Sequence, residues 1–431
     1  MHDEAAVACG DVIDRERLVD DLRAMIRIPS VTGSEEAVAA WAADALRGLG
    51  LTVDTVQPDL AILRADPAWP GEEMPRSSLP VVIGRVGGVG REGGREGGRG
   101  GGRERGPRIV LSGHLDVVPP GEPSTWTADP WGGEIRDGAI YGRGACDMKG
   151  GVASILAAVR ALGESGDLER LTGELIVALV PSEEDGGQGT LAAIRAGATG
   201  DMAIIAEPSD LDVVVAHAGA ITFRLTVPGR AAHASRRREG VSALDKLWVL
   251  ACALEADEAR RNEAETDPLM TALGLPYPTI IGIVGGGEWA STVLDRVTAD
   301  GRYGVRLGQS EADAAAELRA CIEAACAADD FLREHPATVE ITGGRFGSAR
   351  VPSDHPLPVS LAETIEAVTG RRPALLGEPY GADMRLFVNV GDTPCVIFGP
   401  GDVGSAHSAD EHVSLAQVED CARVLAAWVR G

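Results

Sequence analysis

The first half of the chain alternates short apolar runs with segments of helical periodicity, which leaves few folds open to it. The runs "PVVIG", "RIVLSG", "ELIVALV" and "MAIIA" lie between residues 80 and 206. Between the second and the third, the segment "GVASILAAVRAL" places Val152, Ile155, Leu156 and Val159 on one helical face. Apolar strands separated by amphipathic helices predict an α/β sheet covered by helices.

Two helices are expected before the first apolar run. Leu18, Leu22 and Met25 recur at helical spacing. A second helix is predicted at "TGSEEAVAAWAADAL", where Thr32 and Glu35 have the spacing of a capping box.

The pattern of predicted elements changes near residue 219. From "AITFRLTVPG" to "TVEITGG" the order is strand, helix, strand, strand, helix, strand, which is that of a ferredoxin-like unit. A helix at "LPVSLAETIEAVTG" and a strand at "TPCVIFGPG" then return to the earlier pattern. We therefore expect an α/β domain in two parts, residues 1–216 and 347–431, interrupted by an inserted domain at 217–346. A chain of 431 residues is long enough for two hydrophobic cores.

The charge of the chain restricts its partners. A formal net charge of −25 argues against nucleic acid and against anionic membrane surfaces, which both need a basic footprint, and it favours cationic metals. The Gly/Arg-rich run at 86–107 is interpreted as a flexible loop, with RNA binding as the weaker alternative.

The expected compartment is the cytoplasm. The acidic N-terminus lacks the apolar core of an export signal, and no apolar run is long enough for a membrane span. The seven cysteines contain no C-x-x-C pair, which is typical of reduced thiols rather than of a disulfide framework.

Metal-ligand residue types recur at four predicted strand ends. They are His114 and Asp116 in "LSGHLD", Asp147 in "GACDMKG", Glu183 and Glu184 in "VPSEED", and Glu207 in "IIAEPS". Sites in open α/β sheets gather outside the carboxyl ends of the strands, so we expect these side chains to share one cleft. Asp185, followed by two glycines, is interpreted as the turn residue that leads the chain away.

A further candidate ligand, His407, lies in "GSAHSADEHV" near the C-terminus. Histidine and carboxylate donors without thiolate suit zinc, cobalt or manganese. The number of carboxylates suggests two divalent ions, with the remaining charge balanced by a bridging hydroxide.

Together these motifs resemble a known family. The runs "SGHLDVVPPG", "YGRGACDMKGG", "PSEEDGG", "AEPS" and "AHSADEHV" are similar, in order and spacing, to the M20 metallopeptidase family of acetylornithine deacetylase, succinyl-diaminopimelate desuccinylase, aminoacylase and related carboxypeptidases. The likeness extends over nearly the whole chain, and it is more specific at the metal motifs than at the substrate.

The resemblance implies a role for each motif residue. His114 and Glu207 would hold one ion, His407 and Glu184 the other, and Asp147 would bridge them. Asp116 would orient His114, and Glu183 would be the general base that deprotonates the attacking water. The family also tends to hold the peptide after the bridging aspartate in cis, which here is the Asp147–Met148 bond.

For the inserted domain the resemblance implies a homodimer. His233 in "VPGRAAHAS" would reach the active site of the neighbouring subunit and stabilise the oxyanion. Ser291 and Leu294 in "STVLDR" replace an asparagine and a proline that are frequent in relatives, which weakens the expected contact of that asparagine across the dimer.

Three further residues match family positions near the substrate. Arg306 in "GRYGVRLG" corresponds to the lid arginine, and Asp383 and Arg385 in "YGADMRLF" to a pocket motif. Gly381 and Ala382 replace hydroxyl residues of desuccinylases, which weakens that substrate assignment.

The leading hypothesis is a dinuclear zinc amidohydrolase that removes the acyl group from an N-acyl amino acid or a related small amide, with cobalt as an alternative metal. A dipeptidase or carboxypeptidase remains open, because the same chemistry cleaves either bond. From a different class, an inactive metal-binding regulatory member is the other alternative, and the intact Glu183 argues against it.

Overall fold

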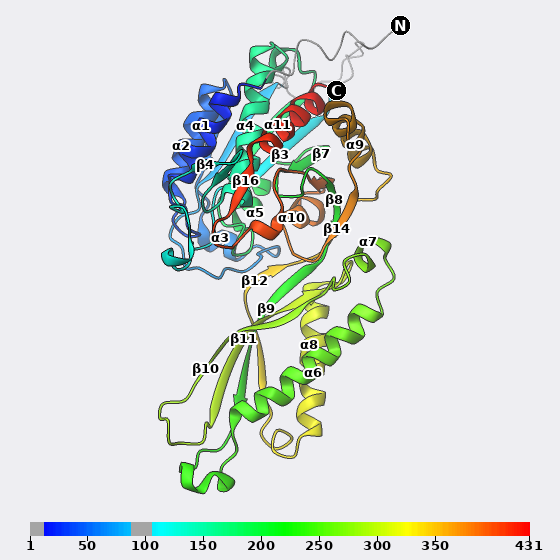
Figure 1. Cartoon of the computed structure of the whole chain (residues 1–431). Helices are drawn as coiled ribbons and strands as arrows, with labels where there is room; N and C mark the ends of the chain where they lie inside the picture. The colour runs from blue at the N-terminus through cyan, green and yellow to red at the C-terminus, as the bar shows by residue number, and fades with distance from the viewer. Residues whose placement is uncertain (1–12, 88–105) are drawn as a thin grey trace.

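The computed structural model describes residues 13–87 and 106–431, so most of the Gly/Arg-rich run at 86–107 lies outside the described residues. Figure 1 shows two parts, a larger one with a broad sheet flanked by helices and a smaller one that projects from it.

The larger part takes its elements from both ends of the chain. Before the smaller part come α1 (Arg15–Ile26), α2 (Glu36–Gly48), β1 (Thr52–Val56), α3 (Leu60–Arg64), β2 (Val81–Gly87), β3 (Arg108–His114), β4 (Glu134–Arg136), β5 (Ala139–Tyr141), α4 (Gly150–Glu164), β6 (Glu174–Val180), α5 (Gln188–Arg195), β7 (Met202–Ile205) and β8 (Val213–His217). After it come β13 (Ala349–Arg350), α9 (Pro356–Thr369), β14 (Leu375–Glu378), α10 (Met384–Asn389), β15 (Cys395–Ile397), β16 (His412–Ser414) and α11 (Leu415–Arg430).

The broad sheet has nine strands in the order β1-β2-β6-β3-β7-β15-β8-β13, with β14 paired to β8. Strand β3 runs parallel to β6 and β7, and β15 runs parallel to β7, whereas β1, β2 and β6 pair antiparallel. Every residue of β6 is buried, which explains the continuous apolar run that follows Glu174 in this strand. The predicted α/β class, with a mixed sheet flanked by helices, is confirmed.

The smaller part consists of β9 (Gly219–Pro228), α6 (Ala243–Glu263), α7 (Pro268–Thr271), β10 (Thr279–Gly286), β11 (Arg296–Val305), α8 (Glu311–Ala328) and β12 (Thr338–Phe346). Its antiparallel sheet has the order β10-β11-β9-β12, which is the ferredoxin-like arrangement predicted for this region. Side chains from β9, α6 and α8, such as Phe223, Leu250 and Leu318, form a separate core. His217 is the last residue of β8 in the broad sheet, so we infer that the inserted domain predicted at 217–346 comprises residues 218–346, and we call it the insert.

The capping box predicted for α2 is wrong. Glu35 is the residue before the helix and makes no side-chain cap hydrogen bond. Its carboxylate accepts from the Gly33 N–H at 2.8 Å and pairs with Arg76, while the Thr32 hydroxyl donates to Asp116 at 3.0 Å. Buried tertiary partners therefore replace the local cap that the spacing suggested.

The topology gathers strand ends at one edge of the broad sheet. Because β3, β6 and β7 are parallel neighbours, the residues that follow them emerge at the same edge. Those residues include Asp116, Glu183 and Glu207. No helix in the described part of the chain is long and apolar enough to cross a membrane.

Candidate metal centre and active site

His114, the last residue of β3, lies at the centre of the predicted ligand cluster and is buried. Its Nε2 atom is 2.9 Å from Asp147 Oδ1 and 3.5 Å from Glu207 Oε1. Asp147 comes from the short helical segment before α4, and Glu207 follows β7. The structure thus brings three predicted ligands from three separate segments within contact distance.

A second group of contacts shares Asp147. His407 Nε2 lies 3.1 Å from Glu184 Oε2 and 3.4 Å from Asp147 Oδ2. One carboxylate oxygen of Asp147 therefore faces His114 and the other faces His407, which is the arrangement required of a residue that bridges two ions. The Asp147–Met148 peptide is cis, as the family resemblance implied.

The electrostatics of the cluster reflect its excess of carboxylates. Burial raises the pKa of Glu207 to about 8, and burial together with the Asp147 carboxylate raises the pKa of Glu184. Hydrogen bonds to Asp147 and Glu184 raise the pKa of His407 to about 10. A cation among these groups would relieve the repulsion between the carboxylates.

The donor set fits divalent metal ions. His114, Asp147 and Glu184 offer ligand atoms that lie within 4.8 Å of one another, and so do His114, Glu183 and Glu207. Imidazole and carboxylate donors suit zinc and similar ions. Glu183 is thus close enough to be a ligand as well as a base, and geometry alone leaves both roles open to it.

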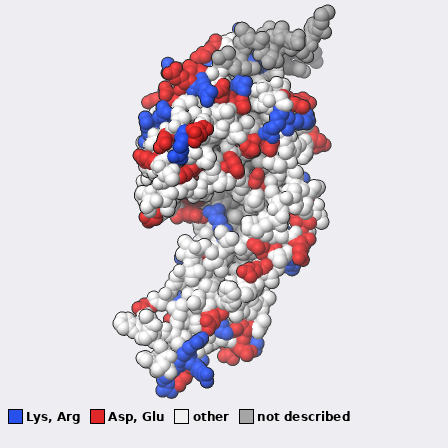
Figure 2. All heavy atoms as spheres, in the orientation of Figure 1, with Lys and Arg blue, Asp and Glu red and all other residues white. Residues whose placement is uncertain are grey.

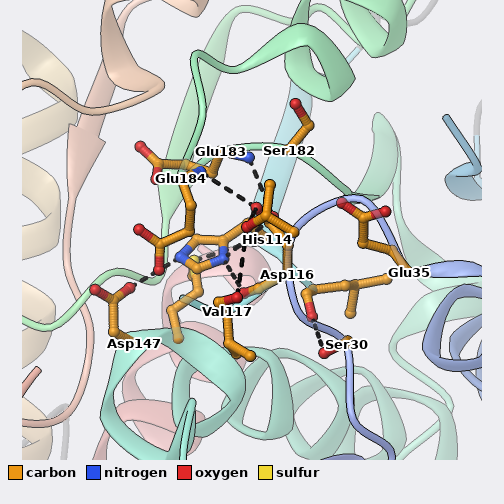
Figure 3. A network of polar contacts seen from close by, with 12 residues as sticks. Ser30, Glu35, His114, Asp116, Val117, Asp147, Ser182, Glu183 and Glu184 are labelled. Atoms are coloured by element: carbon orange, nitrogen blue, oxygen red, sulfur yellow. Dashed lines mark hydrogen bonds and ion pairs between the residues drawn. The ribbon is translucent and has the colours of Figure 1, made fainter. Parts of the chain in front are cut away.

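Asp116 holds the two glutamates by their backbone. Its carboxylate accepts from the Glu183 N–H at 3.1 Å and from the Glu184 N–H at 3.2 Å (Figure 3). The contact with His114 that the resemblance implied is made instead by the Asp116 carbonyl oxygen, 2.9 Å from Nδ1, while the carboxylate lies 3.6 Å away. Asp116 therefore orients the imidazole through its main chain and the glutamates through its side chain.

Asp185 does more than lead the chain out of a turn. It is 2% exposed, and its carboxylate forms an ion pair at 3.0 Å with the buried Arg76 and accepts from the Met74 N–H at 3.2 Å. The sequence gives no sign of this pair, because Arg76 lies far away along the chain in a segment without a motif.

A cavity of about 580 Å³ opens beside the cluster, and the molecular surface is hollowed where the two parts of the protein meet (Figure 2). The ligand candidates Asp147, Glu184, Glu207 and His407 line it together with Glu183. Residues of the insert and of neighbouring loops complete the wall, among them Glu73, Ala220, Ile280, Arg302, Phe346 and Tyr380.

The predicted substrate-binding residues lie outside this wall. Arg306 pairs with Glu317 of α8 at 3.2 Å. Asp383 accepts from the hydroxyl of Thr190 on α5. Arg385 donates to the Gly186 carbonyl at 2.7 Å and so supports the turn that carries Glu183.

The arginine that does face the cavity, Arg302, was not singled out from the sequence. It lies on β11, whereas Arg306 follows the end of that strand, and the Arg302 guanidinium is 3.1 Å from Glu73. The segment "GRYGVRLG" contains both arginines, and the structure distinguishes them: Arg302 lies within β11 and lines the cavity, whereas Arg306 follows the strand and pairs with Glu317.

His233 is exposed in the segment after β9, where its Nδ1 lies 2.9 Å from the Ser235 hydroxyl. This segment is at the end of the insert that points away from the broad sheet (Figure 1). Within one chain, His233 therefore does not join the ligand cluster.

The fold and the site define a metal-dependent hydrolase. The family model of peptidase family M20/M25/M40 matches residues 110–431. The chain belongs to this family.

The chain is similar to proteins that act on different amides. It is 31% identical to a succinyl-diaminopimelate desuccinylase of Methylorubrum extorquens, over 92% of this chain and 94% of the relative. It is 26% identical to the N-formyl-4-amino-5-aminomethyl-2-methylpyrimidine deformylase of Bacillus subtilis, over 90% and 88%. An M20 family metallo-carboxypeptidase from Sulfolobus solfataricus shares the fold with a TM-score of 0.72 at 16% identity, over 96% of this chain and 98% of that one.

The roles of the adjacent glutamates can be separated by metal analysis. We expect Glu184→Gln to lose bound zinc, because we predict that the carboxylate that contacts His407 is a ligand, and we expect Glu183→Gln to keep near-normal zinc content. Elemental analysis of the purified variants measures both. Equal metal loss in the two variants, or loss in Glu183→Gln alone, would contradict these assignments.

Proposed function

We propose that the protein is a deacylase that hydrolyses the amide bond of an N-acyl amino acid or a related small amide. The observation that carries the proposal is the environment of the Glu183 carboxylate. Its carboxylate is buried, lines the cavity, and has neither a hydrogen bond nor an ion pair with any residue of the described chain. A buried, unpaired carboxylate beside a metal-ligand set is suited to accept a proton from water.

The residues support a hydrolytic sequence of steps. Two divalent ions, for which we propose zinc with cobalt as an alternative, would polarise the amide carbonyl and acidify water when bound. Glu183 accepts a proton from the water whose oxygen bonds to the carbonyl carbon. Glu183 then delivers this proton to the nitrogen as the C–N bond breaks. Burial raises the pKa of Glu183, which makes the carboxylate basic enough for the first transfer and its acid form stable enough for the second.

We propose Arg302, rather than Arg306, as the group that pairs with a substrate carboxylate. Its guanidinium lines the cavity and lies over the Phe346 ring at 5.2 Å from the centroid. Arginine binds carboxylates in a bidentate manner, and the aromatic ring below would hold the planar group in place.

A deacylase is favoured over a dipeptidase or carboxypeptidase by the relatives with the higher identity. The names of the desuccinylase and the deformylase both state the removal of an acyl group, succinyl in one and formyl in the other. The similarity to the carboxypeptidase is limited to the fold. We place the protein in the cytoplasm, since the six cysteines among residues 13–87 and 106–431 are all free thiols.

The proposal predicts the outcome of an activity screen over N-acetyl, N-succinyl and N-formyl amino acids and dipeptides with added zinc or cobalt. We expect release of the acyl group from at least one N-acyl amino acid. Glu183→Gln should lower turnover at least about a hundredfold, because the general base is lost. The exposed Glu366, paired with Arg372 on the surface, offers a matched control in Glu366→Gln, which should leave turnover unchanged.

Two results would reject the proposal. Hydrolysis of dipeptides alone would replace the deacylase with a dipeptidase. Full turnover by a metal-loaded Glu183→Gln variant would remove the assigned base.

We further propose that two copies of the chain associate through the insert. Strand β10 is an edge strand, and large apolar side chains are exposed on it and on the neighbouring helix and loop, with Trp289 at 74% and Trp248 at 69%. Exposed apolar surface beside an unpaired strand edge favours association with another chain. The shared site then places His233 of one chain at the cavity of the other, where its ring would stabilise the oxyanion.

Complementation between inactive variants tests the shared site. His233→Ala and Asp147→Asn should each be inactive, whereas an equimolar mixture after subunit exchange should recover about a quarter of the wild-type rate, because half the dimers are mixed and each carries one intact site. Mixing two preparations of His233→Ala is the control. Exchanged dimers without any recovery would contradict the contribution of His233 across subunits.

A further inference from the structure

The segment 69–76 is bonded to the insert along one side. The Arg345 N–H donates to the Pro70 carbonyl at 2.7 Å, and the Arg345 guanidinium donates to the Trp69 carbonyl at 3.0 Å. Glu73 Oε1 accepts from the Thr222 hydroxyl at 3.0 Å and from Arg302 at 3.1 Å. These contacts join the segment to β9, β11 and β12, three strands of the insert.

The same segment is bonded on its other side to the turn at 182–188, which carries Glu183 and Glu184. The Met74 N–H and the Arg76 guanidinium donate to the Asp185 carboxylate at 3.2 and 3.0 Å. The Gln188 side-chain amide donates to the Gly71 carbonyl at 2.6 Å. Because Arg76, Asp185 and Gln188 are buried, water does not compete strongly for these bonds.

The backbone of the segment packs closely against the insert at Gly71. A β-carbon on Gly71 would lie 2.1 Å from the Gly343 carbonyl oxygen, and the Gly71 φ of +86° also favours glycine. Gly343 is on β12, so the two backbones are in direct contact. A shift of the insert must therefore move the segment or break its bonds.

The contacts on both sides connect the insert to the general base, and we propose that segment 69–76 couples the position of the insert to the orientation of Glu183, with Glu73 as the positioning residue. The consequence for catalysis rests on the proposed function, whereas the coupling itself does not.

The coupling also involves the substrate, since Glu73 and Arg302 both line the cavity. A substrate carboxylate that pairs with Arg302 competes with Glu73 for it, so binding of an anionic substrate is transmitted to the turn.

Hydrogen exchange in the zinc-loaded full chain tests the coupling without reference to activity. In Glu73→Gln we expect amide exchange in residues 182–188 to be about two- to thirtyfold faster than in the wild type, because the turn loses its support from the insert. Glu72→Gln is the matched control, since Glu72 lies in the same segment but pairs with Arg64 at 3.0 Å on the surface. Thr222→Val, which removes one donor to Glu73, should give a smaller change in the same direction.

Unchanged exchange at 182–188 in both Glu73→Gln and Thr222→Val would overturn the proposal. Equal acceleration in Glu72→Gln would also overturn it, because the effect would then not depend on the insert.

Kinetics with an anionic N-acyl amino acid provide the second measurement. Glu73→Gln should lower kcat because Glu183 is held less firmly, and it should lower KM because Arg302 loses its competing carboxylate. A residue with only a structural role would not change these two constants in this combination, and unchanged kcat would overturn the role of Glu73. Exchange could respond as expected while neither the wild type nor any variant hydrolyses an amide. In that case the proposed function fails and the coupling stands.

Discussion

The repulsion among buried carboxylates at the carboxyl edge of the broad sheet is the constraint on which the site depends. Asp147, Glu184 and Glu207 lie around two imidazoles, and burial raises the pKa of Glu207 to about 8. Such a group of acids is costly to bury unless positive charge compensates it. The sheet topology brings Glu184 and Glu207 together, because parallel strands β3, β6 and β7 end side by side, and the segment before α4 adds Asp147. Divalent metal ions held by these side chains would supply that positive charge.

Around this group, buried polar side chains hold the backbone rather than the ligands themselves. Asp116 accepts from the main-chain N–H groups of Glu183 and Glu184. Glu411, which is 1% exposed and paired with Arg143, accepts from the N–H of Asp147 at 3.0 Å. Fixing the backbone on both sides of the site sets the directions of the ligand side chains before a metal binds, which lowers the cost of ordering them.

The sequence predicts the fold and the ligand cluster to the extent that their signals are local. A few consecutive residues are enough to recognise each apolar run, each strand or helix of the insert, and the acids that follow β6 and β7. Arg76 with Asp185 and Glu73 with Arg302 are contacts between distant segments. Arg76 lies in no recognised motif, and the motif that contains Arg302 drew attention to Arg306 instead. Thr32 shows the same limit of local patterns. Its spacing predicted a helix cap, but its hydroxyl donates to the buried Asp116, 84 positions away.

Diffraction from zinc-loaded crystals at the zinc absorption edge tests the central claim most directly, because anomalous peaks locate each ion among its ligands. We expect two peaks, one bonded to His114 and Glu207 and the other to His407 and Glu184, with an Asp147 oxygen bonded to each. A single peak, or an ion bonded to Glu183, would contradict the division of the adjacent glutamates into a base and a ligand.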